Sequence, residues 1–259
     1  MTTSLPQPAR IVRVEEETAR VRTFVLDREM DARPGQFLMA WLPGVDEKPF
    51  SLVQACPVTL TVARVGPFTE LLCRQGAGDR LWLRGPLGRP FRLPASPSPT
   101  RGGPGKGRLL LVGGGYGLAP IYFLAELARA AGWRLDAILG ARTAADLFFV
   151  ERFEALGARV WITTDDGSRG ERGLVTDPAG RLLAAGGPQA LYACGPEPML
   201  AALERLARAH RLPAQLSYER YMRCGLGVCG SCARQGWLVC NDGPVRNVGR
   251  ETESVKHET

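Results

Sequence analysis

Histidine is almost missing from this chain of 259 residues, which contains only His210 and His257. Neither lies in a recognisable catalytic motif, and no H-E-x-x-H, G-x-S-x-G or G-x-x-x-x-G-K-S/T pattern occurs. Zinc-protease chemistry and hydrolytic triads therefore have no residues to support them. We expect a cofactor to supply any chemistry that this protein performs.

Lysine and long apolar runs are also scarce. Only three of the 33 basic residues are lysine, and the arginines are scattered without a block of like charge, so the net charge of +7 does not by itself predict a nucleic-acid partner. The most apolar stretch, residues 118–128, contains Pro120 and Glu126 and is shorter than the roughly 18 residues of a membrane span. Residues 1–17 lack the apolar segment of a signal peptide. We expect a soluble, cytoplasmic protein.

The distribution of apolar runs, glycines and prolines divides the chain into three regions. Short apolar runs broken by Gly and Pro predict a small antiparallel β-barrel over residues 1–97, ending in a linker rich in Pro, Gly and Ser. Strands that alternate with helices predict an α/β doubly wound parallel sheet over residues 98–215. Its predicted strands are 108–112, 134–139, 159–163 and 190–193, and its predicted helices are 118–131, 144–156 and 197–210. A small cysteine-rich segment follows over residues 216–259.

Four of the seven cysteines lie close together in the last region, at Cys224, Cys229, Cys232 and Cys240. Their C-x4-C-x2-C…C spacing is typical of plant-type [2Fe–2S] ligation, which needs four thiolates. The loop also contains glycines, which supply the positive φ angles of a tight turn around a cluster: Gly225, Gly227 and Gly230. A structural zinc ion bound by four thiolates, or disulfide bonds, are the alternatives.

A glycine-rich turn, residues 113–120, follows a predicted strand and opens a predicted helix. Such a turn lets the backbone approach a phosphate at a helix N-terminus, although the glycines do not match G-x-G-x-x-G. A tight strand–helix turn without a ligand is the alternative. Cys194 ends another predicted strand at the sheet edge where ligands bind, or it is a small buried residue.

Together, residues 113–120 and 194–199 resemble the nicotinamide-binding domain of the ferredoxin–NADP reductase superfamily, in which a flavin-binding barrel comes first. The flavin signature of that superfamily, Arg-x-Tyr-Ser/Thr, is here Lys48-Pro49-Phe50-Ser51; lysine replaces the arginine fork and phenylalanine lacks the tyrosine hydroxyl. A second flavin element corresponds to residues 61–69. The resemblance implies FAD contacts by Lys48, Pro49, Phe50, Ser51, Thr61, Val62, Ala63, Phe68 and Thr69. It also implies NAD pyrophosphate contacts by Gly114, Gly115 and Gly117, and catalytic roles for Ser51 and Cys194.

The C-terminal segments 219–232 and 239–245 look like the family of electron-transfer subunits of two-subunit, NAD-linked dihydroorotate dehydrogenases. Membership implies a [2Fe–2S] cluster on the four cysteines, FAD, NAD(H) as co-substrate and a role in pyrimidine (UMP) biosynthesis. The implied partner is an FMN-containing catalytic subunit, in a heterotetramer of two copies of each. This chain departs from the family in one respect: only seven residues separate Cys232 from Cys240, where a longer insert is expected.

Two other functions remain open on the sequence. The same cofactors suit the diaphorase subunit of a hydrogenase, a sulfide dehydrogenase or a bifurcating transhydrogenase. A basic protein with structural zinc that binds nucleic acid is the more distant alternative, and it would be colourless.

Overall fold

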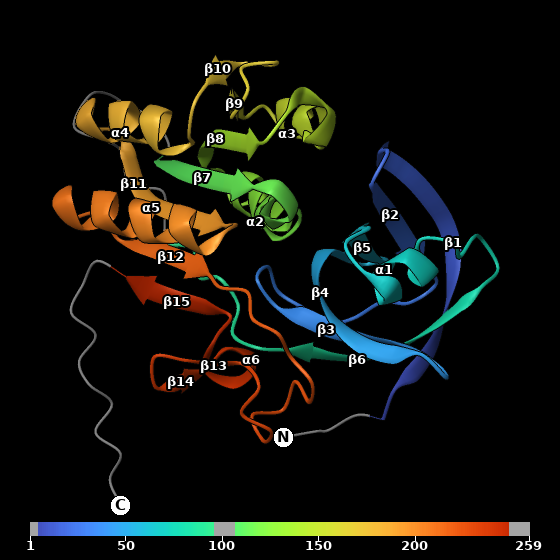
Figure 1. The fold of residues 1–259 in the computed structure, drawn as a ribbon. Helices are drawn as coiled ribbons and strands as arrows, with labels where there is room; N and C mark the ends of the chain where they lie inside the picture. Colours follow the sequence, from blue (N-terminus) through green and yellow to red (C-terminus); the bar gives the residue numbers. More distant parts are fainter. Residues whose placement is uncertain (1–4, 96–106, 249–259) are drawn as a thin grey trace, which may run out of the picture.

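The computed structural model describes residues 5–95 and 107–248. An antiparallel barrel, an α/β layered domain and a short cysteine-rich segment are arranged around a common centre (Figure 1). The barrel and the doubly wound sheet are therefore confirmed. Within the described residues, no helix is both long and apolar enough to cross a membrane.

The barrel closes in the strand order β1-β2-β5-β4-β3-β6, and every neighbouring pair is antiparallel. Side chains that alternate along the strands fill its interior, among them Ile11, Phe24, Leu38 and Leu60, all fully buried. The barrel elements are β1 (Gln7–Thr18), β2 (Val21–Leu26), β3 (Phe37–Leu42), β4 (Asp46–Ala55), β5 (Val58–Ala63), α1 (Pro67–Leu72) and β6 (Arg80–Leu87).

The second domain is a seven-stranded sheet in the order β10-β9-β8-β7-β11-β12-β15, parallel except for the edge strand β15. Its strands are β7 (Arg108–Gly114), β8 (Arg134–Ala141), β9 (Arg159–Thr164), β10 (Glu171–Arg172), β11 (Pro188–Cys194), β12 (Ala214–Ser217) and β15 (Val245–Val248). Its helices are η1 (Gly115–Gly117), α2 (Leu118–Ala130), η2 (Ala144–Asp146), α3 (Val150–Ala155), α4 (Thr176–Ala184) and α5 (Glu197–Ala209).

Helices cover both faces of this sheet. In β7, Leu109 and Leu111 pack with α2 and α3, whereas Leu110 and Val112 pack with α4 and α5. A strand that buries both faces is uniformly apolar, which is why β7 has no polar alternation. The face covered by α2 and α3 is also the one nearer the barrel, since α2 contacts β4. The carboxyl ends of β7 and β11 therefore point into the space between the two domains.

The prediction of one helix over residues 144–156 is wrong. The structure has a short 3-10 turn, η2, then an extended Leu147 and a left-handed Phe149 with φ of 66°, before α3 begins. Phe148 and Phe149 are both buried and pack edge to face against each other. Burial of two consecutive aromatic side chains favours this break over a continuous helix, which would direct them to different faces.

The cysteine-rich segment contains β13 (Ala233–Arg234), β14 (Trp237–Leu238) and the short α6 (Val239–Asp242). The predicted boundary between residues 215 and 216 falls inside β12, and β15 returns from this segment to the sheet. The predicted boundary between residues 97 and 98 lies outside the described residues. The division into three domains stays a prediction.

Candidate functional site

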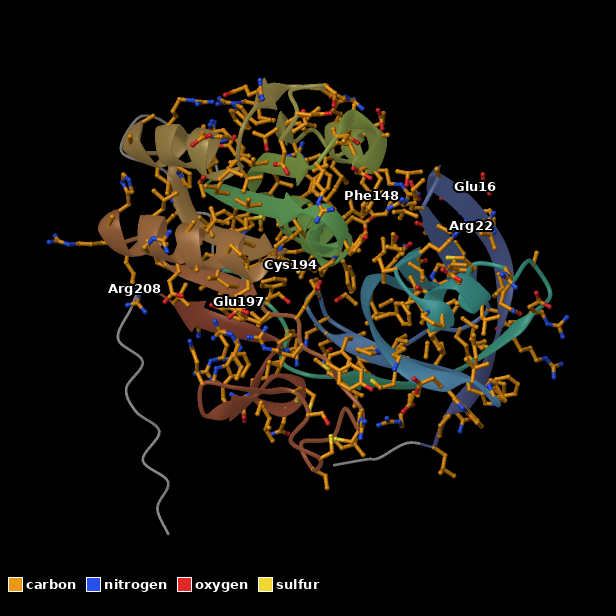
Figure 2. The ribbon with its side chains drawn as sticks, in the orientation of Figure 1. Glu16, Arg22, Phe148, Cys194, Glu197 and Arg208 are labelled. Carbon is orange, nitrogen blue, oxygen red and sulfur yellow. The ribbon has the colours of Figure 1, made fainter. Side chains whose placement is uncertain are left out.

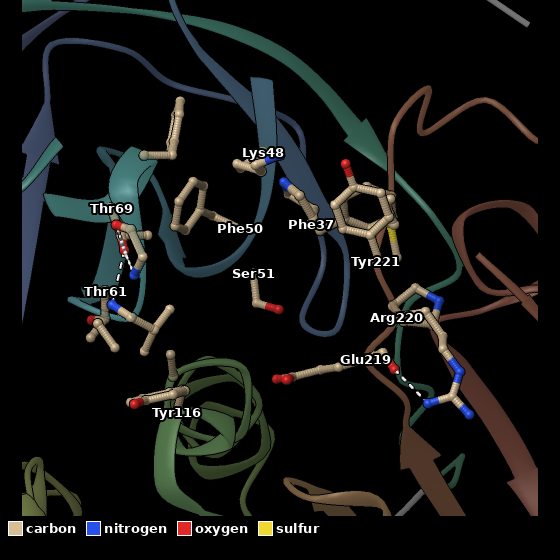
Figure 3. Close-up of a pocket in the computed structure, with 18 of the residues that line it drawn as sticks. Phe37, Lys48, Phe50, Ser51, Thr61, Thr69, Tyr116, Glu219, Arg220 and Tyr221 are labelled. Atoms are coloured by element: carbon tan, nitrogen blue, oxygen red, sulfur yellow. Dashed lines mark hydrogen bonds between the residues drawn. The ribbon is translucent and has the colours of Figure 1, made fainter. Parts of the chain in front are cut away.

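A cavity of about 390 Å³ lies where the barrel, the second domain and the start of the cysteine-rich segment meet (Figure 3). Barrel residues 48–51 and 65–69 form one wall, Tyr116 and Ala119 form another, and residues 217–222 form the third. Three regions that are distant in the sequence therefore enclose one space. The cavity volume is in the usual range of a cofactor or small-molecule site.

The predicted flavin signature lies on β4 and faces this cavity. Lys48, Pro49, Phe50 and Ser51 all line it, and the Ser51 hydroxyl points into the open space (Figure 3). The Lys48 ammonium pairs with Asp46 at 2.5 Å and lies 5.1 Å from the centre of the Tyr221 ring. This wall offers an aromatic surface, a hydroxyl and one cation, which suits a ring system that carries phosphate groups.

The second predicted flavin element lies on β5 and α1. Thr61, Ala63, Phe68 and Thr69 line the cavity, whereas the Val62 side chain is buried in the barrel core. The rings of Phe68 and Phe50 lie 6.1 Å apart. The Thr69 hydroxyl accepts the N–H groups of residues 65 and 66, at 2.9 and 3.1 Å, and so holds the turn that begins α1. Thr69 thus shapes the cavity wall, and Val62 offers only its backbone.

The glycine-rich turn and the strand end at Cys194 lie against each other. A Cβ atom placed on Gly117 would be 2.1 Å from the Cys194 carbonyl oxygen, and one on Gly114 would be 2.6 Å from Met199 Sδ. Only glycine permits this approach of backbone to backbone. Gly115 has φ of +53° and open space around it. The turn is therefore closed toward β11 and open on its outer side, as a phosphate-binding turn must be.

Cys194 is buried behind this turn, near the centre of the molecule (Figure 2), and it does not line the cavity. Burial raises the pKa of its thiol far above the usual value, and the negative charge of Glu219 adds to this effect. The thiol is consequently neutral at physiological pH and is not a nucleophile. The structure brings Cys194 beside the glycine turn but keeps it apart from the surface that Ser51 presents.

Sequence reasoning missed Glu219, whose carboxylate reaches into the cavity between Ser51 and Tyr116 (Figure 3). The side chain is open to the cavity, yet protein surrounds it elsewhere, and this burial raises the pKa of the carboxyl. Its position just after β12 is a hint in the sequence, because carboxyl ends of parallel strands form ligand sites. Tyr116, Tyr218 and Tyr221 line the same cavity and were also missed.

The four predicted cluster ligands lie on and beside a loop whose glycines have φ of 65° (Gly225), 77° (Gly227) and 72° (Gly230). These left-handed turns direct backbone N–H groups at sulfur. Cys224 Sγ accepts from residues 226 and 229 at 3.3 and 3.5 Å, and Cys240 Sγ accepts from Gly227 at 3.2 Å. N–H groups aimed at thiolate sulfurs are what an iron–sulfur cluster requires of its protein.

The four thiols differ in environment. Cys232 and Cys240 are buried with their sulfurs 3.2 Å apart, too far for a disulfide bond, whereas Cys229 is exposed. Hydrogen bonding to Ser231 lowers the pKa of Cys229 to about 6, which favours the thiolate that binds metals. In the described residues, no three side chains of Cys, His, Asp or Glu converge as a shell for one ion. Four cysteine thiols, with backbone N–H groups aimed at two of the sulfurs, form a donor set that fits a [2Fe–2S] cluster.

A buried apolar group of side chains joins the cavity to these cysteines. Phe37 and Met222 line the cavity, and they pack in one cluster with Met39, Cys232, Val239 and Cys240. The cavity and the candidate metal site therefore share a buried wall. Such a contact suits electron exchange between two bound groups.

Two parts of the chain match families of known domains. Residues 219–250 match the iron-sulfur cluster binding domain of dihydroorotate dehydrogenase B, and residues 111–205 match the oxidoreductase NAD-binding domain. The first match begins at Glu219 and contains all four predicted ligands. The second begins inside β7 and contains the glycine-rich turn.

Relatives align with almost the whole chain. A protein from Methanocaldococcus jannaschii named "Probable dihydroorotate dehydrogenase B (NAD(+)), electron transfer subunit" is 41% identical over 93% of this chain and 89% of its own. A protein of the same name from Thermococcus kodakarensis is 43% identical over 91% of this chain and 95% of its own.

Among solved structures, one described as an NADH-dependent reduced ferredoxin-NADP oxidoreductase that performs flavin-based electron bifurcation is similar. It has a TM-score of 0.81 at 29% identity and covers 95% of this chain and 90% of that one. A ferredoxin reductase of carbazole 1,9a-dioxygenase, at 23% identity and a TM-score of 0.64 over 78% of this chain and 65% of that one, shares the fold.

Proposed function

This chain belongs to the family of electron transfer subunits of dihydroorotate dehydrogenase B, and from this membership we propose that it carries electrons between NAD(H) and a catalytic subunit in the formation of orotate for UMP. The observation that supports this best is the single cavity next to all three predicted sites. Such an arrangement serves a protein that connects a nicotinamide, a flavin and a cluster.

For FAD, we assign the cavity to its flavin part. Phe50 and Tyr116 offer aromatic surface from opposite walls, and the Ser51 hydroxyl and Glu219 carboxyl face the space between them. The residues that we assign to FAD are Lys48, Pro49, Phe50, Ser51, Thr61, Ala63, Phe68 and Thr69, with Val62 contributing backbone alone. Phe37 and Met222 close the cavity toward the cysteines and keep water from that wall.

For NAD(H), we assign the pyrophosphate to Gly114, Gly115 and Gly117. The strand end at Cys194 supports this turn from behind, and its neutral thiol places no charge near the nicotinamide. When bound, FAD exchanges a hydride with NAD(H) and single electrons with a [2Fe–2S] cluster on Cys224, Cys229, Cys232 and Cys240. This chain then needs no general base, which agrees with its lack of a histidine at the site.

For the partner, we propose an FMN-containing catalytic subunit that docks on the cysteine loop, in a complex of two copies of each. The loop exposes Tyr221 by 58%, Leu226 by 37% and Val228 by 81%, beside the exposed Cys229. Apolar side chains grouped around a redox ligand are typical of an interaction surface. We expect Val228→Glu to weaken the complex in native mass spectrometry, whereas Leu174→Glu, on a distant surface with 62% exposure, leaves it intact.

The bifurcating reductase neighbour supports a second candidate, a subunit that passes electrons to another redox partner. Its 29% identity is lower than the 41% and 43% of the dihydroorotate dehydrogenase relatives over similar lengths, and the first proposal is favoured. Both candidates oxidise NADH through flavin. They differ in the partner that receives the electrons.

The deciding experiment purifies the tagged chain with its native partner, without oxygen, and measures NADH-driven reduction of orotate and of a dye. We also propose that the complex works in the cytoplasm, and fractionation of the same cells tests this. Reduction of both acceptors supports the proposal. Reduction of the dye alone would keep the redox module and refute the pyrimidine partner. A colourless sample that reduces neither would refute the redox function.

A further inference from the structure

Arg84 and Glu47 form a shielded ion pair on the barrel strands β6 and β4. Arg84 Nε and Nη2 donate to the two carboxylate oxygens of Glu47, at 3.1 and 2.7 Å. The Arg84 side chain is 11% exposed, the lowest value for a cation among the ion pairs of the described residues, and Glu47 is 23% exposed. This bidentate geometry holds the guanidinium in one orientation.

The same guanidinium reaches the cysteine loop. Arg84 Nη2 also donates to the backbone carbonyl oxygen of Cys224 at 2.8 Å, across 140 residues of sequence. Among the hydrogen bonds of the described residues, it is the one that runs from the barrel to residues 224–232. The next residue, Gly225, packs closely on Met39 and Leu87 of the barrel. The first cysteine of the loop is therefore attached to the barrel that forms the flavin cavity.

The pair is not explained by stability alone. Apolar residues of similar volume can replace a buried ion pair without loss, and here Arg84 Nη1 is buried with no partner at all. Arginine remains charged at every physiological pH. The reduction potential of an iron–sulfur cluster depends on nearby charge, hydrogen bonding and exposure. Arg84 is a fixed cation hydrogen-bonded to the backbone of the proposed ligand Cys224, so it affects the charge, the hydrogen bonding and the exposure around the cluster.

We infer that Arg84, oriented by Glu47, is a positioning residue for the cluster: it fixes Cys224 against the flavin barrel and raises the reduction potential of the cluster. The inference rests on the proposed role of Cys224 as a ligand. The positive end of the pair is nearer to Cys224 than the negative end, so the pair stabilises the reduced, more negative cluster.

The test is a redox titration of the full-length protein, followed by the EPR signal and visible absorption of the reduced [2Fe–2S] cluster. For Arg84→Met, we expect the ratio of reduced to oxidised cluster at the wild-type midpoint to fall about tenfold, a shift of about 59 mV for a one-electron couple. Glu47→Gln keeps the cation and removes the opposing charge, so its midpoint rises. The double variant Arg84→Met/Glu47→Gln lies between Arg84→Met and the wild type, because it loses the net effect of the pair, which is smaller than the effect of Arg84 alone. Arg80→Met, an exposed arginine of the same strand, is the matched control and shifts nothing.

Opposite shifts in the two single variants separate an electrostatic role from a structural one, because a loosened loop changes exposure in the same direction in both. Shifts of the same sign, or no shift in either, would overturn the inference. If Arg84→Met does not fold, Glu47→Gln alone decides, since it retains the hydrogen bond to Cys224. A wild-type protein without a [2Fe–2S] signal would overturn the proposed function, and with it this inference. A normal wild-type signal with unshifted variants overturns the inference alone.

Discussion

Replacing Gly117 by alanine is expected to damage NADH binding while leaving the flavin and the cluster in place. Gly117 has φ of −62°, which alanine adopts freely, so backbone strain is not the cause. The obstacle is space, because the new Cβ would lie 2.1 Å from the Cys194 carbonyl oxygen and 2.3 Å from its carbon. Both atoms belong to the backbone of a central strand and cannot rotate away.

The size of the loss in NADH kinetics follows from how far the glycine turn must move away from β11. Real Cβ contacts are essentially never shorter than 3.0 Å, so the glycine turn has to move from β11 by about 1 Å, and a displacement of that size costs about a hundredfold in kcat/KM. The overpacking itself costs about 1–3 kcal/mol of stability. We therefore expect kcat/KM for NADH to fall about a hundredfold in a protein that still folds.

The assay is steady-state reduction of a dye by NADH, with flavin absorbance, cluster EPR and thermal unfolding recorded on the same samples. Gly186→Ala, after α4 and outside the glycine-rich turn, is the matched control: its φ of +63° makes alanine unfavourable by about 1–2 kcal/mol, yet nothing lies within 4 Å of the new Cβ. The two variants then lose similar stability but differ in NADH kinetics. An unchanged kcat/KM in Gly117→Ala, or an equal loss in both, would refute the reasoning.

Three further predictions follow from single contacts. Cys240→Ser abolishes the [2Fe–2S] EPR signal and leaves flavin absorbance unchanged, whereas Cys56→Ser, at an exposed thiol of the barrel, changes neither. Burial raises the pKa of Glu126 above 4.5, so the wild type gains stability as the pH falls toward 4.5 and loses it as the pH rises through the raised pKa. Glu126→Gln has no such carboxyl, and its unfolding temperature, measured across this pH range, should change less with pH than that of the wild type. Arg152 pairs with Glu15 at 2.6 Å and Glu17 at 2.5 Å between α3 and β1. Arg152→Ala costs about 1–2 kcal/mol in urea unfolding, because it leaves the shielded Glu17 unpaired; a loss below 0.5 kcal/mol, as is usual for an exposed pair, would contradict this.

Local chemistry made part of the molecule predictable. The cysteine spacing and its glycines predict a tight loop, and the three glycines do have positive φ. A continuous apolar run predicts the central strand β7, since a strand covered on both faces needs no polar alternation. In each case a few neighbouring residues carry the whole signal.

Other elements depend on distant contacts and were beyond the sequence. The helix α4 contains Pro178 and Gly180, both unfavourable in most helices, although proline is tolerated in the first turn. The break before α3 comes from burial of Phe148 and Phe149, which overrides local helix preference. Arg84 matters only because the fold places it next to Cys224, 140 positions later in the chain. Spacing within the chain does not encode such pairs.

The residues between β12 and Cys224 link the cysteine-rich segment to the cavity. Ser217 ends a strand of the nucleotide-binding sheet, residues 218–222 form a wall of the cavity, and Cys224 follows at once. Met222, before the loop, and Cys240, after it, share a buried cluster with the barrel residues Phe37 and Met39, and β15 then returns to pair with β12. One short segment therefore sets the positions of the sheet edge, the cavity wall and the first cysteine together. A displacement of any one of them moves the other two, so the distance between the cavity and the cysteines is determined by the fold and not by a mobile tether.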